Sequence, residues 1–180
     1  MGTVFVDNLE PQSGTTLTLG ASGDTVNLGS GGTVTNTPFF HVYLGSDQSV
    51  SSGATHKVAF DTEVYDSNNN YDNSTNYRYT PTVAGKYVFY TGVVYYADSA
   101  GMNFNKVSIR LNGSTIGAGE SDLRSNPGRQ MTSFAQVIQE MNGSTDYVEV
   151  YSFVQSATGT SHFESESRMT YFGGYRMIGA

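Results

Sequence analysis

The strongest hairpin signal in the chain is Val107-Ser108-Ile109-Arg110-Leu111-Asn112-Gly113-Ser114-Thr115-Ile116. Its first five residues alternate apolar and polar side chains, which is the period of a β-strand with one buried face. Asn112-Gly113 then supplies two residues that tolerate the positive φ angles of a tight hairpin turn. The stretch therefore predicts an antiparallel hairpin, with one strand ending at Leu111 and the next beginning at Ser114.

Further strand-like runs extend on both sides of this hairpin, from Pro38 to the end of the chain. They are rich in β-branched and aromatic residues and are bounded by Asn, Asp, Gly and Pro, which are typical of turns. No run longer than one turn indicates a helix. The pattern predicts an all-β fold of about ten short strands, a β-sandwich or jelly roll. The expected strands are Phe39–Leu44, His56–Val64, Asn76–Thr80, Lys86–Tyr96, Val107–Leu111, Ser114–Ile116, Ser133–Glu140, Tyr147–Val154 and Arg168–Ile178.

The composition excludes several classes of protein. Charged residues make up only 14% of the 180 residues, and the formal net charge is −7, so nucleic-acid binding is not expected. The chain has no cysteine, which excludes disulfides and thiolate metal sites. No apolar run is long enough for a transmembrane helix, and Met1–Glu10 lacks the regions of a secretory signal. We therefore expect no membrane insertion.

Residues 1–37 differ from the rest because they are rich in Gly, Ser and Thr and contain a decaying repeat. The copies are Ser13–Gly20, Ser22–Gly29 and Ser30–Thr35. Each copy reads as a glycine turn followed by a short alternating strand. One such strand carries too few apolar side chains to fold alone, so we expect copies from other chains to pack against it. The alternative is a flexible Gly/Ser linker. We predict a β-repeat attachment segment at 1–37 and a jelly roll at 38–180.

The larger part of the chain resembles the globular head of the complement 1q/tumour-necrosis-factor superfamily. Five short motifs occur in the family's order, and together they cover roughly residues 38 to 180. The resemblance implies a jelly roll that forms a homotrimer. The motifs are Val58–Asp61 with Tyr71-Asp72, Tyr77–Pro81 with Ala84–Phe89, Leu111–Gly113, Asn142–Val150 and Tyr171–Tyr175.

The N-terminal part carries a second resemblance. Asp7–Leu17, followed by Leu-Gly and Ser-Gly repeats, resembles the N-termini of structural proteins of tailed phages, especially marine ones. Such segments precede fibre or decoration domains, so the resemblance implies a virion location and attachment to other virion proteins. The collagen stalk of the complement family is missing, because no Gly-x-y triplets occur. This departure disfavours a complement-type animal ligand.

The sequence offers little catalytic chemistry. No nucleophile-elbow, zincin or Walker motif occurs, and His41, His56 and His162 are isolated along the chain. Glu164 and Glu166 form a pair of acids, but Ser161–Ser167 reads as a solvated loop. We therefore expect a protein that is not an enzyme and that has no cofactor and no metal.

The loop Asp66–Asp72 has a pattern of polar residues that could bind calcium. Asp66, Asn68, Asn70 and Asp72 place oxygen atoms at alternate positions, as calcium-binding loops do. The loop lacks the glycine and the final acidic residue of such sites. The alternative is an Asx-turn loop, in which Asn and Asp side chains bond their own backbone. The sequence favours the Asx turns.

Recognition in a jelly roll usually falls to the loops at one end of the strands. The irregular, polar stretches Asp66–Asn76, Ala97–Asn103, Gly119–Arg129 and Ser156–Glu166 are the candidates. Inter-subunit salt bridges are the alternative role for the charged residues among them, and the many tyrosines could be core, subunit interface or a platform for sugars. The candidate recognition residues are Asp66, Asn68, Asn70, Asp72, Arg124, Arg129, Glu164 and Glu166.

Taken together, these features predict a non-enzymatic phage virion protein, a trimeric fibre or fibre-tip module that contacts a glycan or protein on the host surface. A trimeric capsid decoration protein is the alternative. A cellular trimeric ligand of the complement type is a third reading.

Overall fold

The computed structural model describes residues 8–14, 17–30, 32, 37–97, 101–157 and 160–178, and it divides the chain into two units, Met1–Thr35 and Asn36–Ala180. In the first unit, the described residues 8–14, 17–30 and 32 form no strand within the single chain. The expected β-repeat was predicted to need other chains, so its pairing stays a prediction. The large apolar side chains of this stretch are all exposed: Leu9, Leu17, Leu19, Val26 and Leu28.

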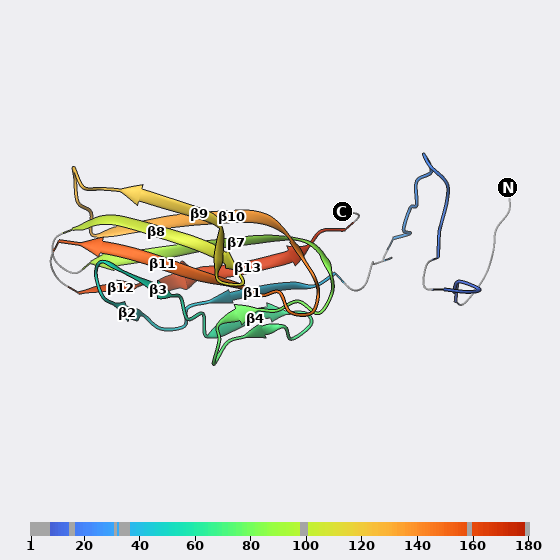
Figure 1. The fold of residues 1–180 in the computed structure, drawn as a ribbon, viewed down its shortest axis with the longest axis horizontal. Helices are drawn as coiled ribbons and strands as arrows, with labels where there is room; N and C mark the ends of the chain where they lie inside the picture. The colour runs from blue at the N-terminus through green and yellow to red at the C-terminus, as the bar shows by residue number, and fades with distance from the viewer. Residues whose placement is uncertain are drawn as a thin grey trace. The chain divides into compact units, whose positions relative to one another are not determined.

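The second unit is a sandwich of two mainly antiparallel sheets (Figure 1). In the seven-stranded sheet, the long strand β7 is the central element. It pairs with β10 along one side, and with β13 and then β12 along the other. The strands of this sheet are β1 (Phe39–Tyr43), β2 (Gln48–Val50), β4 (Thr62–Asp66), β7 (Gly85–Ala97), β10 (Gln130–Met141), β12 (Ser161–Phe163) and β13 (Tyr171–Arg176).

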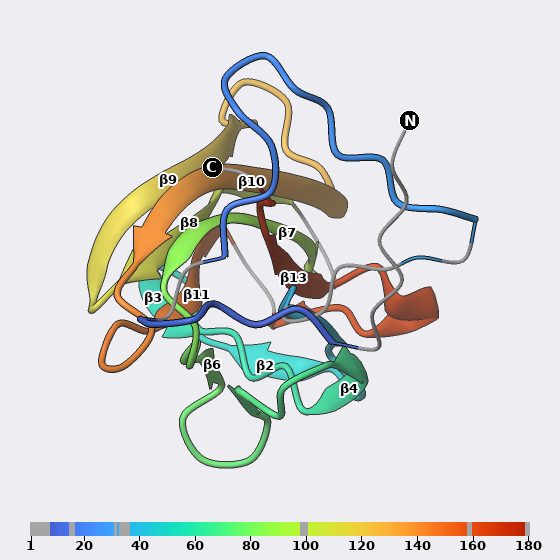
Figure 2. The same ribbon diagram turned by 90° about the vertical axis from the view of Figure 1, so that its right-hand side faces the viewer.

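The six-stranded sheet is built around β11, which pairs with β8 along one side, and with β6 and β3 along the other. Its strands are β3 (Ala54–Lys57), β5 (Tyr71–Asp72), β6 (Arg78–Tyr79), β8 (Met102–Leu111), β9 (Ser114–Asp122) and β11 (Val148–Ser156). Seen along the strands in Figure 2, β9 of this sheet lies beside β10 of the other. Gly119 makes this approach possible, because a Cβ there would collide with the carbonyl oxygen of Phe134.

The core between the sheets is aromatic. Phe40 stacks on Tyr79 with ring centroids 4.1 Å apart and meets Phe172 edge-on at 4.9 Å. The ring of Phe89 stacks on that of Tyr87. These side chains come from both sheets and are almost fully buried. Burying aromatic rings in this way removes a large apolar area from water, which is the main favourable contribution to the stability of the fold.

The hairpin predicted at Asn112-Gly113 is confirmed. Asn112 and Gly113 have φ angles of 49° and 84°, and β8 pairs with β9 directly beyond them. Both strands are longer than predicted. The all-β jelly-roll class is also confirmed, and the one helical element of the described residues is a single 3-10 turn, η1 (Glu166–Arg168).

Some expectations about strands and loops are wrong. The stretches expected as the loops Asp66–Asn76 and Gly119–Arg129 contain β5 and the end of β9. His56–Val64 is not one strand, because β3 ends at Lys57 in the six-stranded sheet and β4 begins at Thr62 in the other. The buried side chains of Val58 and Phe60 fill the crossing between them. The loop expected at Ser156–Glu166 contains β12, where Ser161 and Phe163 are buried. Its three residues are too few for their alternation to be recognised from sequence.

Candidate functional site

The outward face of the seven-stranded sheet carries a cluster of aromatic rings, which we call the aromatic face. Its centre is formed by Tyr90, Phe134, Tyr171 and His41. The rings of Tyr90 and Tyr171 lie 6.2 Å apart. They pack closely over the strands because Gly92 and Gly173 lack a Cβ, which would press on the rings of Phe134, Tyr171 and Tyr90.

Much of the aromatic face is open in a single chain. Phe134 and Ile138 of β10 are 61% and 59% exposed, and Tyr175 of β13 is 49% exposed. Two shallow hollows of about 330 and 290 Å³ flank the ring of Phe134 and share Tyr171 as a second wall. Exposed apolar patches of this kind mark interfaces. The aromatic face is therefore the best candidate for contact with another protein surface.

His41 lies at the edge of this cluster. Its Nδ1 is 3.3 Å from the hydroxyl of Tyr90, and its ring packs on that of Tyr171. Burial lowers the pKa of His41 from its ordinary value, and the nearby Arg168 guanidinium lowers it further. The aromatic face thus favours an uncharged imidazole.

The outward face of the six-stranded sheet is polar and hollowed. A groove of about 390 Å³ runs over β8, with an aromatic wall from Phe104 and Phe153, whose rings meet edge-on at 5.9 Å. Lys106 and Glu120 form an ion pair of 3.6 Å across it. The groove can accept a polar ligand with a flat apolar part. Its lining residues are Thr55, Phe104, Lys106, Ser108, Arg110, Thr115, Glu120 and Phe153.

Positive charge gathers beside this groove, although the chain is acidic overall. The ring of Tyr151 lies under the Arg110 guanidinium at 4.0 Å and the Lys57 ammonium at 5.5 Å. Lys57 also pairs with Glu149, which is only 5% exposed. The Nε atom of Arg110 is buried and has no hydrogen-bond partner among the described residues. The Arg110 side chain is therefore held by its stacking on Tyr151, and it lines the groove.

The loop with alternating oxygens uses those oxygens itself. Both carboxylate oxygens of Asp72 accept backbone N–H bonds, from Ser74 at 3.1 Å, Thr75 at 2.9 Å and Asn76 at 3.1 Å. These bonds, led by the one from Thr75, hold the pKa of Asp72 far below its usual range. Asp66 accepts the Tyr71 N–H at 2.7 Å in the same way.

The amides of the same loop are also engaged. Asn68 accepts a hydrogen bond from Ser67 at 2.9 Å, and Asn70 donates to Thr82 at 3.3 Å. The geometry supports the Asx-turn interpretation over a calcium loop. A recognition role for these residues stays a prediction.

The two arginines predicted for recognition have local partners. Arg124 pairs with Asp122, the last residue of β9 and two residues away in the chain. Arg129 lies over the ring of Tyr96 at 5.3 Å and donates to its hydroxyl. Salt bridges from these residues to another subunit therefore stay a prediction.

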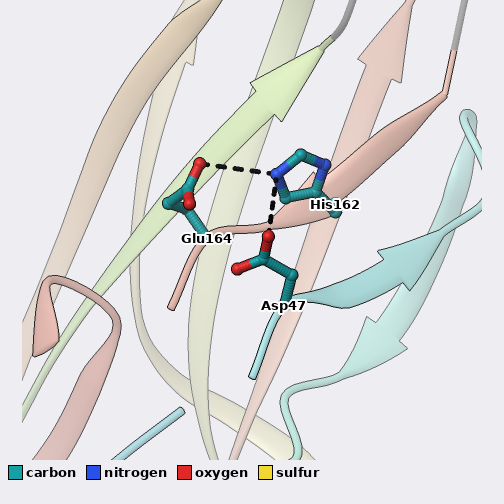
Figure 3. Close-up of side chains that lie close together, drawn as sticks. All are labelled: Asp47, His162 and Glu164. Carbon is teal, nitrogen blue, oxygen red and sulfur yellow. Dashed lines mark hydrogen bonds and ion pairs between the residues drawn. The ribbon is translucent and has the colours of Figure 1, made fainter. Parts of the chain in front are cut away.

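The two glutamates predicted as a solvated pair are separated. Glu166 is exposed on η1, whereas the side chain of Glu164 is only 16% exposed and faces His162 at 3.4 Å. Asp47, which precedes β2, approaches the same nitrogen of His162 at 3.6 Å (Figure 3). Among the described residues, this is a group of side chains that could hold a metal ion, with ligand atoms within 4.8 Å of one another.

Sequence reasoning missed this cluster because Asp47 is remote in the chain from His162 and Glu164. Only the pairing of β2 with β12, both very short, brings them together. The alternation of His162 and Glu164 around buried Phe163 is the one local signal that could have indicated it. In the described residues, no helix is long and apolar enough to cross a membrane.

Comparisons with known proteins bear on the fold. The sequence matches no protein-family model, and it matches no curated protein. The structure is similar to the Eiger TNF from S. frugiperda, with a TM-score of 0.54 and 15% identity over 80% of this chain and 93% of that one. It is also similar to murine APRIL, with a TM-score of 0.55 and 12% identity over 79% and 100% of the two chains.

The globular domain of the zebrafish complement 1qA protein is a third similar structure. Its TM-score is 0.57, with 13% identity over 78% of this chain and 98% of that domain. At such low identities the likeness concerns the fold alone. The second unit of the chain therefore has the jelly-roll fold of the tumour-necrosis-factor and complement 1q domains.

Proposed function

We propose that the chain is a non-enzymatic, homotrimeric binding module, built as the fibre or fibre tip of a phage particle. Its jelly roll assembles through the aromatic face, its N-terminal unit attaches the trimer to other virion proteins, and its remaining surfaces contact a glycan or protein on the host.

The aromatic face is the observation that carries this proposal. Phe134, Ile138 and Tyr175 are too exposed in one chain for a stable monomer surface, and they lie side by side with Tyr90 and Tyr171. Identical chains usually bury such a patch in a closed symmetric oligomer, because closure leaves no copy of the interface exposed. The fold shared with tumour-necrosis-factor and complement 1q domains is compatible with three-fold assembly.

The N-terminal unit supports the attachment role. Leu17, Leu19, Val26 and Leu28 recur at a fixed phase and are exposed in the single chain. An apolar side chain repeated in this way has no use in a freely solvated linker. We expect these residues to pack against copies of themselves or against a virion partner.

The proposal is tested with two variants of the protein, each produced during assembly of the phage particle. Deleting residues 1–37 should leave a folded jelly roll but remove the protein from the particle. The second variant carries three substitutions to Ala at exposed positions. Asn68 and Thr75 lie in the loop Asp66–Asn76, and Thr115 lines the groove of the six-stranded sheet. This variant should stay on the particle and lose host binding. Cryo-electron microscopy of particles and a cell-binding assay are the measurements.

The results of these two measurements distinguish a fibre from a capsid decoration protein. Density at the head and particles that fall apart without residues 1–37 would indicate the capsid decoration protein instead of a fibre. A truncated protein that remains on particles would contradict the attachment role. Replacing whole loops is unsuitable, because buried Tyr71 and Phe163 lie within Asp66–Asn76 and Ser156–Glu166.

A cellular trimeric ligand is the second candidate. The similarity to Eiger TNF and murine APRIL favours it. The two candidates differ in what the N-terminal unit does, because a cellular ligand has no virion to bind. Failure to find the protein in purified particles, together with specific binding to a cell-surface receptor, would favour this candidate.

A further inference from the structure

Three side chains converge beside the short strand β12. His162 points outward from β12, Glu164 follows that strand, and Asp47 lies just before β2 (Figure 3). The pairing of Ser49 with His162 holds the two strands in register. The backbone of Glu164 is fixed as well, since its N–H donates to the carbonyl of Val94 at 2.9 Å. One ligand residue therefore lies in a strand of the sheet, and the other two lie directly beside strands.

The spacing of these atoms fits a shared cation better than direct pairing. Nε2 of His162 lies 3.4 Å from Oε2 of Glu164 and 3.6 Å from Oδ2 of Asp47. A charge-assisted N–H···O bond would be about 2.7–2.9 Å long. Ligands at the Zn–N and Zn–O distances of a tetrahedral site stand about 3.4 Å apart from one another. The two separations from Nε2 of His162 match this spacing, and all three ligand atoms lie within 4.8 Å of one another.

The charges of the cluster point in the same direction. Two carboxylates face one imidazole, and a single Nε2 nitrogen can donate at most one proton between them. Two anions held close together are unfavourable unless a cation lies between them. In the described residues, no Lys or Arg forms an ion pair with Asp47 or Glu164.

The surrounding groups orient the ligands as supporting groups do in metal sites. Oδ1 of Asp47 accepts two hydrogen bonds from Ser165, one from its N–H at 2.8 Å and one from its hydroxyl at 2.7 Å. Its other oxygen is thereby left to face His162. The ring of Tyr96 packs against the imidazole of His162 with centroids 4.9 Å apart. Contacts of this kind to metal ligands fix the ligand geometry and tune the affinity for the metal.

We propose that Asp47, His162 and Glu164 form a binding site for a divalent transition-metal ion of the zinc class. One nitrogen and two oxygen ligands suit Zn²⁺, with Mn²⁺ bound less tightly, and they do not suit Ca²⁺, which takes six to eight oxygens. Three protein ligands leave a coordination position open to water. In a chain without cysteine, the ion would tie the segment before β2 to the segment after β12.

The experiment is calorimetric titration of the full chain, freed of metal with a chelator, with Zn²⁺, Mn²⁺ and Ca²⁺ in turn. We expect one Zn²⁺ per chain and weaker binding of Mn²⁺. His162→Gln should reduce Zn²⁺ affinity by well over 10-fold, and Ser165→Ala by about 10-fold, as for supporting residues of other metal sites. The same excess of Zn²⁺ should raise the Tm of the wild type more than that of His162→Gln.

Two matched controls separate the site from adventitious binding. His56→Gln removes another histidine, which bonds to Ser51, and Glu166→Gln removes a nearby exposed acid; both should bind Zn²⁺ like the wild type. Asp47→Asn replaces His162→Gln if that variant fails to fold. The proposal is overturned by no Zn²⁺ binding to the wild type, by equal affinity in the ligand variants, or by a preference for Ca²⁺.

Discussion

The two sheets of the sandwich bury similar aromatic cores but present opposite chemistry to the outside. The aromatic face of the seven-stranded sheet has exposed Phe134, Ile138 and Tyr175 at its surface. The outward face of the six-stranded sheet carries the ion pair of Lys57 with Glu149 and the Arg110 guanidinium stacked on Tyr151. The first face gains free energy by leaving water, whereas the second satisfies its charges within one chain and can stay hydrated. On the proposed function, we expect the aromatic face to serve assembly and the outward face of the six-stranded sheet to serve recognition.

The largest expected effect comes from placing charge on the aromatic face. Phe134→Asp combined with Ile138→Asp should abolish assembly, because two carboxylates would have to be desolvated in the subunit interface. Light scattering should show the wild type at about three times 19.4 kDa and the variant as a folded monomer of 19.4 kDa. Both side chains are exposed in the single chain, so the fold of the monomer should survive.

The matched control places the same charges on the other sheet. Thr55→Asp with Gln155→Asp changes two exposed positions on the six-stranded sheet, and this variant should keep the mass of the wild type. If the wild type itself is monomeric at micromolar concentration, the aromatic face is not an assembly surface. Loss of assembly in the control variant would mean that the division of tasks between the faces is wrong.

The sequence predicts the turns and the core-facing residues of the strands better than it predicts the outward faces of the sheets. Asn112-Gly113 determines a turn locally, because few residue pairs adopt two successive positive φ angles. The alternation in Val107–Leu111 likewise places Val107 and Ile109 on the core face, where both are fully buried. Neither signal says which sheet a strand joins, so His56–Val64 was expected to be one strand although it divides between the two sheets.

The candidate metal site lies beyond local signals altogether. Its ligands meet through the pairing of β2 with β12, and three-residue strands carry almost no periodicity. Exposure of the aromatic face was equally hidden, since Tyr90 and Tyr87 belong to the same run of apolar residues in β7. Only the structure shows that the ring of Tyr87 is buried in the core while that of Tyr90 lies on the aromatic face.

An intermediate effect is expected from the charges of the six-stranded sheet. Lys57→Met leaves the carboxylate of Glu149 buried without its ammonium partner, which should lower the free energy of unfolding by about 3 kcal/mol. Lys106→Met should cost less than about 1 kcal/mol, because its partner Glu120 is well exposed. Denaturant unfolding at one protein concentration is the measurement.

A double variant completes this test. Adding Glu149→Leu to Lys57→Met should restore most of the lost stability, because the buried charge is then gone. If Lys57→Met is as mild as Lys106→Met, the neighbouring Arg78 and Arg110, which flank Glu149 on adjacent strands, are neutralising it instead. That result would make the outward face of this sheet a shared cation network and not a set of separate pairs.

The smallest expected effect concerns pH and returns to the aromatic face. Burial and Arg168 lower the pKa of His41 in the folded chain, so in mildly acidic solution the unfolded chain binds more protons at this position than the folded one. Stability should therefore fall as the pH drops below the ordinary histidine value of about 6.5, and His41 should contribute no pH dependence above it.

His41→Phe keeps a ring against Tyr90 and Tyr171 and removes the titration. Comparing the Tm of wild type and variant between pH 7.5 and pH 5.5 isolates this residue, because the rest of the chain is the same in both proteins. The wild type should lose more Tm on acidification than the variant, and an identical loss in both would show that the aromatic face tolerates a charged imidazole.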